Sequence, residues 1–365
     1  MRTLIIADRA FVMRERTLLS RLVIGLADEG VRVACAVPVS LLERVQMDFP
    51  VGPVLGFEDG GVVLSREPRV SRLIEKLQAP ERDRAQFDIV HAFGGSIWGF
   101  TLDLARRLDA LSVLEVWRPG LADRARALRS GHQPIAFFAP SPGIERILLK
   151  EGVGLTVRLT PWGIMPTKTP NPLLRENREV SIVLIGSGRD TSAIVDAFNG
   201  TCQVLRSHPD AMLFIDTDAA ARTHIWKLAR QQNLVDRISI IDAVEERRDL
   251  VIRCDILLYP ESRGEQRTIL LDAMGAGMAV IARADPMIGA LVPDVTARVL
   301  TDPSAETWAS EIERLLENPE NARALGRSAR QRIRNEYRAT THVRSVIDAY
   351  EWLMSSKPIS SASVR

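Results

Sequence analysis

The stretch Asp255–Ala282, with the sequence DILLYPESRGEQRTILLDAMGAGMAVIA, contains the pattern that decides the fold. It opens with a short apolar run that predicts a buried parallel strand, and a polar loop follows. A compact helix is expected from about Thr268 to Ala276, ended by Gly277, before a second strand at Ala279–Ala282. This succession is a βαβ unit, and such units bind ligands at the carboxyl ends of their strands.

The N-terminus of the helix that begins near Thr268 faces the polar loop. Its first backbone N–H groups have no partner within the helix, and together with the helix dipole they suit a phosphate group. An ordinary βαβ unit without a ligand would show the same succession of elements. The glycines and acidic residues around the loop favour a binding site, because they lie where such a site would need them.

Length and composition exclude several classes of protein. A chain of 365 residues predicts two domains, and 46% hydrophobic with 26% charged residues is typical of a soluble globular protein. The net charge of +2, with arginines spread along the chain, argues against a nucleic-acid partner. No apolar run approaches the roughly 18 residues of a membrane span, and the first apolar run is too short for a signal peptide.

The cysteine pattern bears on location and on metal binding. Cys35, Cys202 and Cys254 are few, odd in number and widely separated. This pattern excludes a disulfide framework and a zinc site of the CxxC type. It fits a reducing compartment, so we expect a cytoplasmic protein.

Strands and helices alternate through both halves of the chain, which predicts an α/β fold with parallel sheets. The rhythm is broken between Pro161 and Asn177, where four prolines indicate an interdomain linker. Two Rossmann-like domains are therefore expected. Their predicted bounds are 1–165 for the N-terminal domain, 166–178 for the linker and 179–338 for the C-terminal domain, followed by a helix at 339–356 and a flexible tail at 357–365.

Three segments are similar to a known family: FDIVHA at Phe87–Ala92, LTPWGI at Leu159–Ile164, and LLDAMGAGMAVIA within the opening stretch. They resemble the GT-B glycosyltransferases, and within these the family 4 retaining enzymes, known as glycosyl transferases group 1. The resemblance covers nearly the whole chain and is most specific in the C-terminal half. It implies the GT-B fold, with two facing Rossmann-like domains and a last helix that crosses back to the first domain.

The resemblance also implies an activity. It predicts a retaining hexosyltransferase that moves a sugar from a nucleotide-diphosphate sugar to a glycan or lipid-linked acceptor, without a metal or other cofactor. A lipid-linked acceptor would bring peripheral contact with the inner face of the membrane. The alternative is a catalytically weakened GT-B-like protein that binds a glycan or a protein partner. A sugar-phosphate epimerase or a phosphorylase is a third reading of the same fold.

The donor motif departs from the family pattern, which has two glutamates separated by seven residues. The second position is Asp272 here, and the first is Gly264, with Glu265 beside it. The resemblance implies that Asp272 binds the ribose of the nucleotide. It makes Glu265 the acidic residue nearest the sugar, provided that the loop path brings its side chain there.

The positive charges that neutralise the donor diphosphate are also altered. Gly188 and Arg189 match the family's arginine turn, but no lysine follows. Arg263 or Arg267 could supply the missing charge, although solvated loop arginines are the alternative reading. The predicted donor-binding set comprises Gly188, Arg189, Arg263, Arg267, Thr268, Ile269 and Asp272.

Two further features of the sequence could take part in the chemistry. The resemblance places His91 where it could touch the donor sugar or transfer a proton, whereas a lone histidine is more often a structural hydrogen-bonding residue. The triplet Asp216-Thr217-Asp218 resembles a metal-binding D-x-D pattern. We interpret this triplet as a turn and helix cap, so no metal ligands are predicted.

Overall fold

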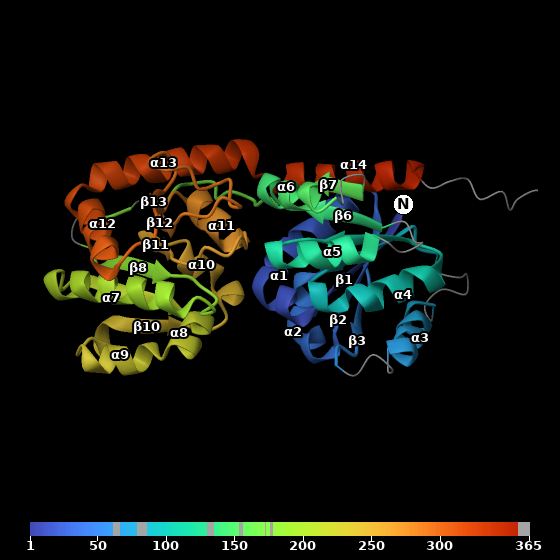
Figure 1. The fold of residues 1–365 in the computed structure, drawn as a ribbon, viewed down its shortest axis with the longest axis horizontal. Coiled ribbons are helices and arrows are strands. Elements are labelled where there is room, and N and C mark those ends of the chain that lie inside the picture. The colour runs from blue at the N-terminus through green and yellow to red at the C-terminus, as the bar shows by residue number, and fades with distance from the viewer. Residues whose placement is uncertain are drawn as a thin grey trace, which may run out of the picture. The chain divides into compact units, whose positions relative to one another are not determined.

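The computed structural model describes residues 1–60, 66–78, 86–129, 135–152, 156–171, 173–175 and 178–356. Internal contacts divide the chain into two compact units (Figure 1). Unit 1 consists of Met1–Trp162 and Ala339–Arg365, and unit 2 of Gly163–Arg338. The segment 166–178, predicted as a linker, falls within the range of unit 2. Among the described residues, no helix is long and apolar enough to cross a membrane.

Unit 1 is built on a seven-stranded parallel sheet with the strand order β3-β2-β1-β4-β5-β6-β7. Its central strands are short, mostly apolar and buried along their whole length, as is typical of parallel strands covered by helices on both faces. The strands are β1 (Arg2–Ala7), β2 (Arg32–Pro38), β3 (Val54–Phe57), β4 (Ile89–Phe93), β5 (Leu111–Glu115), β6 (Ile135–Ala139) and β7 (Val157–Leu159).

The helices of unit 1 include the last helix of the chain. They are α1 (Arg9–Asp28), α2 (Leu42–Val45), α3 (Arg66–Gln78), α4 (Trp98–Leu108), α5 (Ala122–Arg129), α6 (Pro142–Lys150) and α14 (Ala339–Ser355), with 3-10 turns η1 (Val39–Leu41), η2 (Gln46–Asp48), η4 (Gly95–Ile97) and η5 (Pro119–Leu121). Ser141 caps α6 by accepting a hydrogen bond from the N–H of Ile144 at 3.3 Å.

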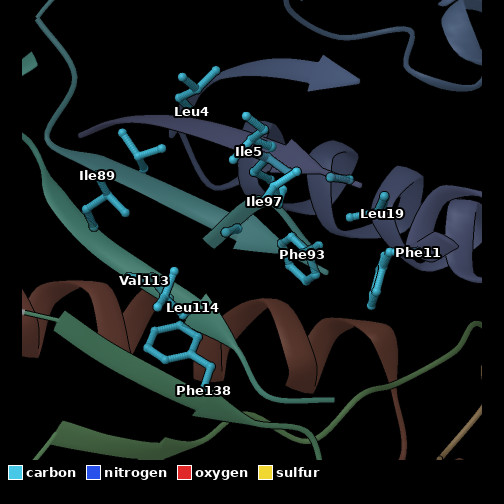
Figure 2. Packing of buried hydrophobic residues seen from close by; sticks show 14 of the residues in the cluster. Leu4, Ile5, Phe11, Leu19, Ile89, Phe93, Ile97, Val113, Leu114 and Phe138 are labelled. Atoms are coloured by element: carbon cyan, nitrogen blue, oxygen red, sulfur yellow. The ribbon is translucent and has the colours of Figure 1, made fainter. Parts of the chain in front are cut away.

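The core of unit 1 lies between the sheet and its helices. Figure 2 shows side chains from β1, β4 and β5 converging there with Phe11 and Leu19 of α1. Helix α14 packs against α1 and adds Val343, Val346 and Tyr350 to the same core. The sequence prediction that the C-terminal helix returns to the first domain is therefore confirmed.

Unit 2, like unit 1, is built on a parallel sheet, here of six strands in the order β10-β9-β8-β11-β12-β13. Together the two parallel sheets, each enclosed in its own α/β unit, form the predicted GT-B fold. The strands are β8 (Val180–Leu184), β9 (Ala211–Asp216), β10 (Ile238–Ile241), β11 (Ile256–Tyr259), β12 (Ala279–Arg283) and β13 (Arg298–Leu300).

The helices of unit 2 pack in pairs, α7 with α12 and α11 with α13. They are α7 (Thr191–Ser207), α8 (Thr217–Thr223), α9 (Ile225–Gln231), α10 (Arg248–Val251), α11 (Thr268–Ala276), α12 (Ala305–Glu317) and α13 (Pro319–Glu336), with 3-10 turns η7 (Val235–Arg237) and η8 (Val244–Glu246). Helix α13 approaches the end of α11 so closely that a Cβ on Gly326 of α13 would overlap the carbonyl oxygen of Gly277.

Two local predictions are confirmed in unit 2. Gly277 ends α11 in the left-handed conformation, with φ of 89°, which glycine adopts without a steric penalty. Asp216 caps α8 by accepting a hydrogen bond from the N–H of Asp218 at 3.1 Å. The acidic triplet 216–218 is therefore a helix start, as its interpretation as a cap requires.

Candidate functional site

The candidate site lies at the topological switch point of the unit 2 sheet. Strands β8 and β11 are hydrogen-bonded neighbours, but the chain leaves β8 toward β9 on one side and leaves β11 toward β12 on the other. Open α/β sheets bind ligands where the strand order reverses, beyond the carboxyl ends of the strands. The loops that follow β8 and β11 are therefore the place to look for chemistry.

The loop after β8, residues 185–190, turns sharply into α7. Gly188 makes the turn with φ of 69°, and a Cβ there would lie 2.7 Å from the carbonyl oxygen of Asp218. Asp190 caps α7 by accepting a hydrogen bond from the N–H of Ala193 at 3.2 Å. The loop thus presents backbone N–H groups and the side chain of Arg189 at the switch point.

The loop after β11, residues 260–267, leads into α11 and carries the altered donor motif. Gly264 has φ of 67°, and its N–H donates to the carboxylate of Asp285 at 2.6 Å. The hydroxyl of Tyr259 donates to the carbonyl oxygen of Glu265 at 2.9 Å. These two bonds fix the loop path on both sides of Glu265.

The loop path brings three of the predicted residues together. The guanidinium of Arg189 lies 3.3 Å from the carboxylate of Glu265, and that of Arg263 lies 4.0 Å from the same carboxylate. Glu265 is buried, whereas the side chain of Arg189 is 34% exposed. The carboxylate of Glu265 therefore positions two guanidinium groups at the switch point without the help of a ligand.

A second ionic group surrounds Asp272. Its carboxylate accepts a hydrogen bond from the guanidinium of Arg248, which also bonds the carboxylate of Glu245 and the hydroxyl of Thr268. All four side chains are buried. Arg248 and Glu245 are not among the site residues predicted from the sequence. In the sequence they are only a basic and an acidic residue shortly before β11. Their partner Asp272 lies more than 20 residues further along the chain, so the sequence does not show that they meet.

Three other residues of the predicted donor-binding set, Arg267, Thr268 and Ile269, are buried inside unit 2. Arg267 is buried and lies 3.3 Å from the carboxylate of Asp216. Ile269 is fully buried, so it can face a ligand only through its backbone. Thr268 opens α11 and is likewise buried, with its hydroxyl on Arg248.

His91 lies in unit 1, in the middle of β4, and its ring is fully buried. Its Nδ1 lies 2.7 Å from the hydroxyl of Tyr350, and its Nε2 lies 3.3 Å from the carboxylate of Glu115. Burial lowers the pKa of His91 well below its usual value, with a further contribution from His342. The other oxygen of Glu115 accepts a hydrogen bond from the indole N–H of Trp162 at 2.7 Å.

The ionisation of this buried group is set by desolvation. Burial raises the pKa of Glu115 to about 8, and the Trp162 hydrogen bond opposes that rise. Burial likewise raises the pKa of Tyr350 well above its usual value. At neutral pH the group is therefore a chain of neutral hydrogen-bonding partners that links α14 to the middle of β4 and to the end of β5. A catalytic role for His91 stays a prediction.

A carboxylate outside the predicted donor-binding set also reaches the switch point. Glu261, two residues after the end of β11, accepts hydrogen bonds from Ser187 and from the N–H of Asp190 in the loop after β8. Its position directly after Pro260, where the buried strand ends, was the signal available in the sequence. Within the described ranges, no group of three or more His, Cys, Asp or Glu side chains could hold a metal ion.

The C-terminal part of the chain matches a known family. Residues 173–332 match the family described as glycosyl transferases group 1. No curated protein matches the chain. The family match covers both loops of the switch point, and it ends within α13.

Solved structures with the same fold cover nearly the whole chain. Sucrose-phosphate synthase from Thermosynechococcus elongatus is 16% identical, with a TM-score of 0.74 over 97% of this chain and 100% of that one. HepE from Anabaena, in complex with UDP and glucose, is 11% identical, with a TM-score of 0.73 over 96% and 100%. A Listeria monocytogenes structure attributed to a UDP-N-acetylglucosamine 2-epimerase is 15% identical, with a TM-score of 0.67 over 98% and 97%. At these identities the likeness establishes the fold alone.

Proposed function

We propose that this chain is a retaining glycosyltransferase that moves a hexose from a nucleotide-diphosphate sugar to a glycan or lipid-linked acceptor. The observation that carries the proposal is the meeting of Arg189, Glu265 and the N-terminus of α11 at the switch point of unit 2. The family match over residues 173–332 supports nucleotide-sugar glycosyl transfer as the chemistry of this unit.

The roles follow from where charge develops. Transfer of the sugar leaves two negative charges on the departing diphosphate, and a metal-free enzyme stabilises them with arginine and helix N–H groups. In the proposal, Arg189 and the first N–H groups of α11 bind the diphosphate, with Arg263 and Arg267 adding positive charge nearby. Asp272 accepts hydrogen bonds from the ribose, and Glu265 lies nearest the transferred sugar. Removing one such charged donor costs about 2.7–4 kcal/mol of transition-state stabilisation by analogy with a lost oxyanion donor.

The first experiment separates phosphate recognition from nucleoside recognition. Arg189→Ala should weaken binding of a nucleotide diphosphate far more than binding of the matching nucleoside, because only the phosphates need the guanidinium. Arg253→Ala, at an exposed position of the same unit, is the control. Equal weakening of both ligands by Arg189→Ala would contradict the proposed role.

The proposal includes independence from metal ions. Sugar transfer should continue in excess chelator, with the donor chosen by a screen of nucleotide sugars for hydrolysis. Activity that disappears with the chelator and returns with Mn²⁺ would overturn this part of the proposal. A cytoplasmic setting, at the membrane surface if the acceptor is lipid-linked, belongs to the same proposal and is supported by three buried free cysteines.

A second function is favoured by the pairing of charges in unit 2. Arg189, Arg248 and Arg267 each have a carboxylate partner within the unit, so the diphosphate would have to compete for them. This arrangement suits a catalytically weakened protein that binds a glycan or a partner. Thermal stabilisation by nucleotides distinguishes the two, since a ligand at 100 times its Kd adds about 2.7 kcal/mol to the free energy of unfolding. Absence of stabilisation by any nucleotide would favour the protein that binds a glycan or a partner.

A further inference from the structure

Glu261 places a carboxylate on the backbone N–H groups of the loop after β8. Its Oε1 accepts hydrogen bonds from the N–H of Asp190 at 2.9 Å and from the hydroxyl of Ser187 at 2.9 Å. Its Oε2 accepts from the N–H of Ser187. The side chain is only 8% exposed, so both oxygens are committed to this loop.

The backbone N–H groups that donate to Glu261 lie in a type of loop that commonly binds phosphate. The loop joins a central strand to α7, a helix of 17 residues, and Gly188 turns it through the left-handed conformation. Successive N–H groups in such a turn at the start of a helix form a concavity for anions. Two oxygens of one carboxylate occupy it as two oxygens of a phosphate would.

Glu261 is not needed to cap the helix. Asp190 already caps α7 through the N–H of Ala193, and its carboxylate also lies 3.0 Å from the guanidinium of Arg283. The role left for Glu261 is to hold the loop after β8 against the loop after β11. The two loops meet where the proposed function places the diphosphate.

We infer that Glu261 sets the phosphate affinity of the donor site by occupying the loop N–H groups that a ligand phosphate would otherwise take. The inference rests on the proposed function, because it assumes that the diphosphate binds at this switch point. A carboxylate and a phosphate carry like charges and cannot share the same donors, so a diphosphate must displace Glu261 before it can use them. In the unmodified protein the phosphates therefore gain no affinity from the N–H groups of the loop after β8.

Inorganic pyrophosphate tests the inference without requiring a known base or sugar. Its Kd should be measured by calorimetry for the unmodified protein, for Glu261→Ser and for Glu261→Gln. The serine variant should bind pyrophosphate about tenfold more tightly or better, the scale of one charge-assisted hydrogen bond. Glu261→Gln keeps the side-chain volume, so it provides a folded variant if the serine variant does not fold, and it should also bind more tightly.

Glu317→Gln, an exposed residue at the end of α12, makes the same change of charge in unit 2 and should bind pyrophosphate as the unmodified protein does. Equal or weaker binding by both Glu261 variants would overturn the inference, as would an equal gain in the Glu317 variant. No detectable pyrophosphate binding by a folded Glu261 variant would also overturn it. Failure of the proposed function is seen separately, as the absence of turnover of any nucleotide sugar.

Discussion

Replacing Glu115 by glutamine should change how the stability of unit 1 depends on pH. Glu115 is buried at the end of β5 between Trp162 and His91. In Glu115→Gln the amide oxygen can still accept the Trp162 N–H, and the amide NH₂ can donate to His91 Nε2. The substitution therefore removes the ionisable group while it keeps the shape and the hydrogen bonds.

The magnitude follows from the pKa of Glu115, which burial raises from its ordinary value of 4.5 to about 8. Between these values the unfolded carboxyl is ionised while the folded one keeps its proton, so unfolding releases a proton and stability falls as pH rises. The stabilisation from this carboxyl is complete below pH 4.5 and lost as pH rises to about 8. From pH 5 to pH 7 the unmodified protein should lose about 2.5 kcal/mol relative to Glu115→Gln.

Other titrating groups near Glu115 should not obscure the difference. Burial lowers the pKa of His91 well below its usual value and that of His342 to about 4, so both stay neutral across the window. Both histidines are present in the two proteins, and their contribution cancels when the proteins are compared. Glu75→Gln, on the exposed side of α3, is the control for loss of one carboxylate.

Hydrogen exchange measured by mass spectrometry suits a protein with two units. Peptides from β4 and β5 report the opening free energy of unit 1, and peptides from β8 and β11 serve as an internal reference. The difference between Glu115→Gln and the unmodified protein should grow with pH for the unit 1 peptides only. A difference that stays flat from pH 5 to pH 8 would refute the reasoning, because it would mean that Glu115 is ionised in the folded protein.

Two further predictions concern packing and thiol chemistry. Gly326→Ala should destabilise unit 2 by about 1–3 kcal/mol in urea unfolding, because its Cβ would overlap the carbonyl oxygen of Gly277. Gly289→Ala, whose Cβ would meet only the hydroxyl of Tyr337 at 3.3 Å, should cost less, and equal costs would contradict the close approach. The three buried cysteines, whose pKa values burial raises to about 12, should react with a thiol reagent only after unfolding; rapid labelling of the folded protein would disagree.

Much of the fold follows from short-range patterns in the sequence. Apolar runs bounded by glycine or proline predict the buried parallel strands, and Gly277 and Ser141 mark the end of one helix and the start of another. The acidic triplet at Asp216 was identified as a helix cap for the same reason. These features depend on backbone sterics and hydrogen bonds within a few residues, so the local sequence is sufficient to determine them.

The partners of the site residues depend on tertiary structure instead. Glu261 meets Ser187 across 74 residues of sequence, and His91 meets Tyr350 across 259. Each pair forms because the strand order or a returning helix brings distant segments together, and nothing in the local pattern encodes that meeting. The sequence alone determined which residues could carry charge at the switch point of unit 2. The tertiary structure decided which of those charges face each other, because ion pairing and burial act through space and not along the chain.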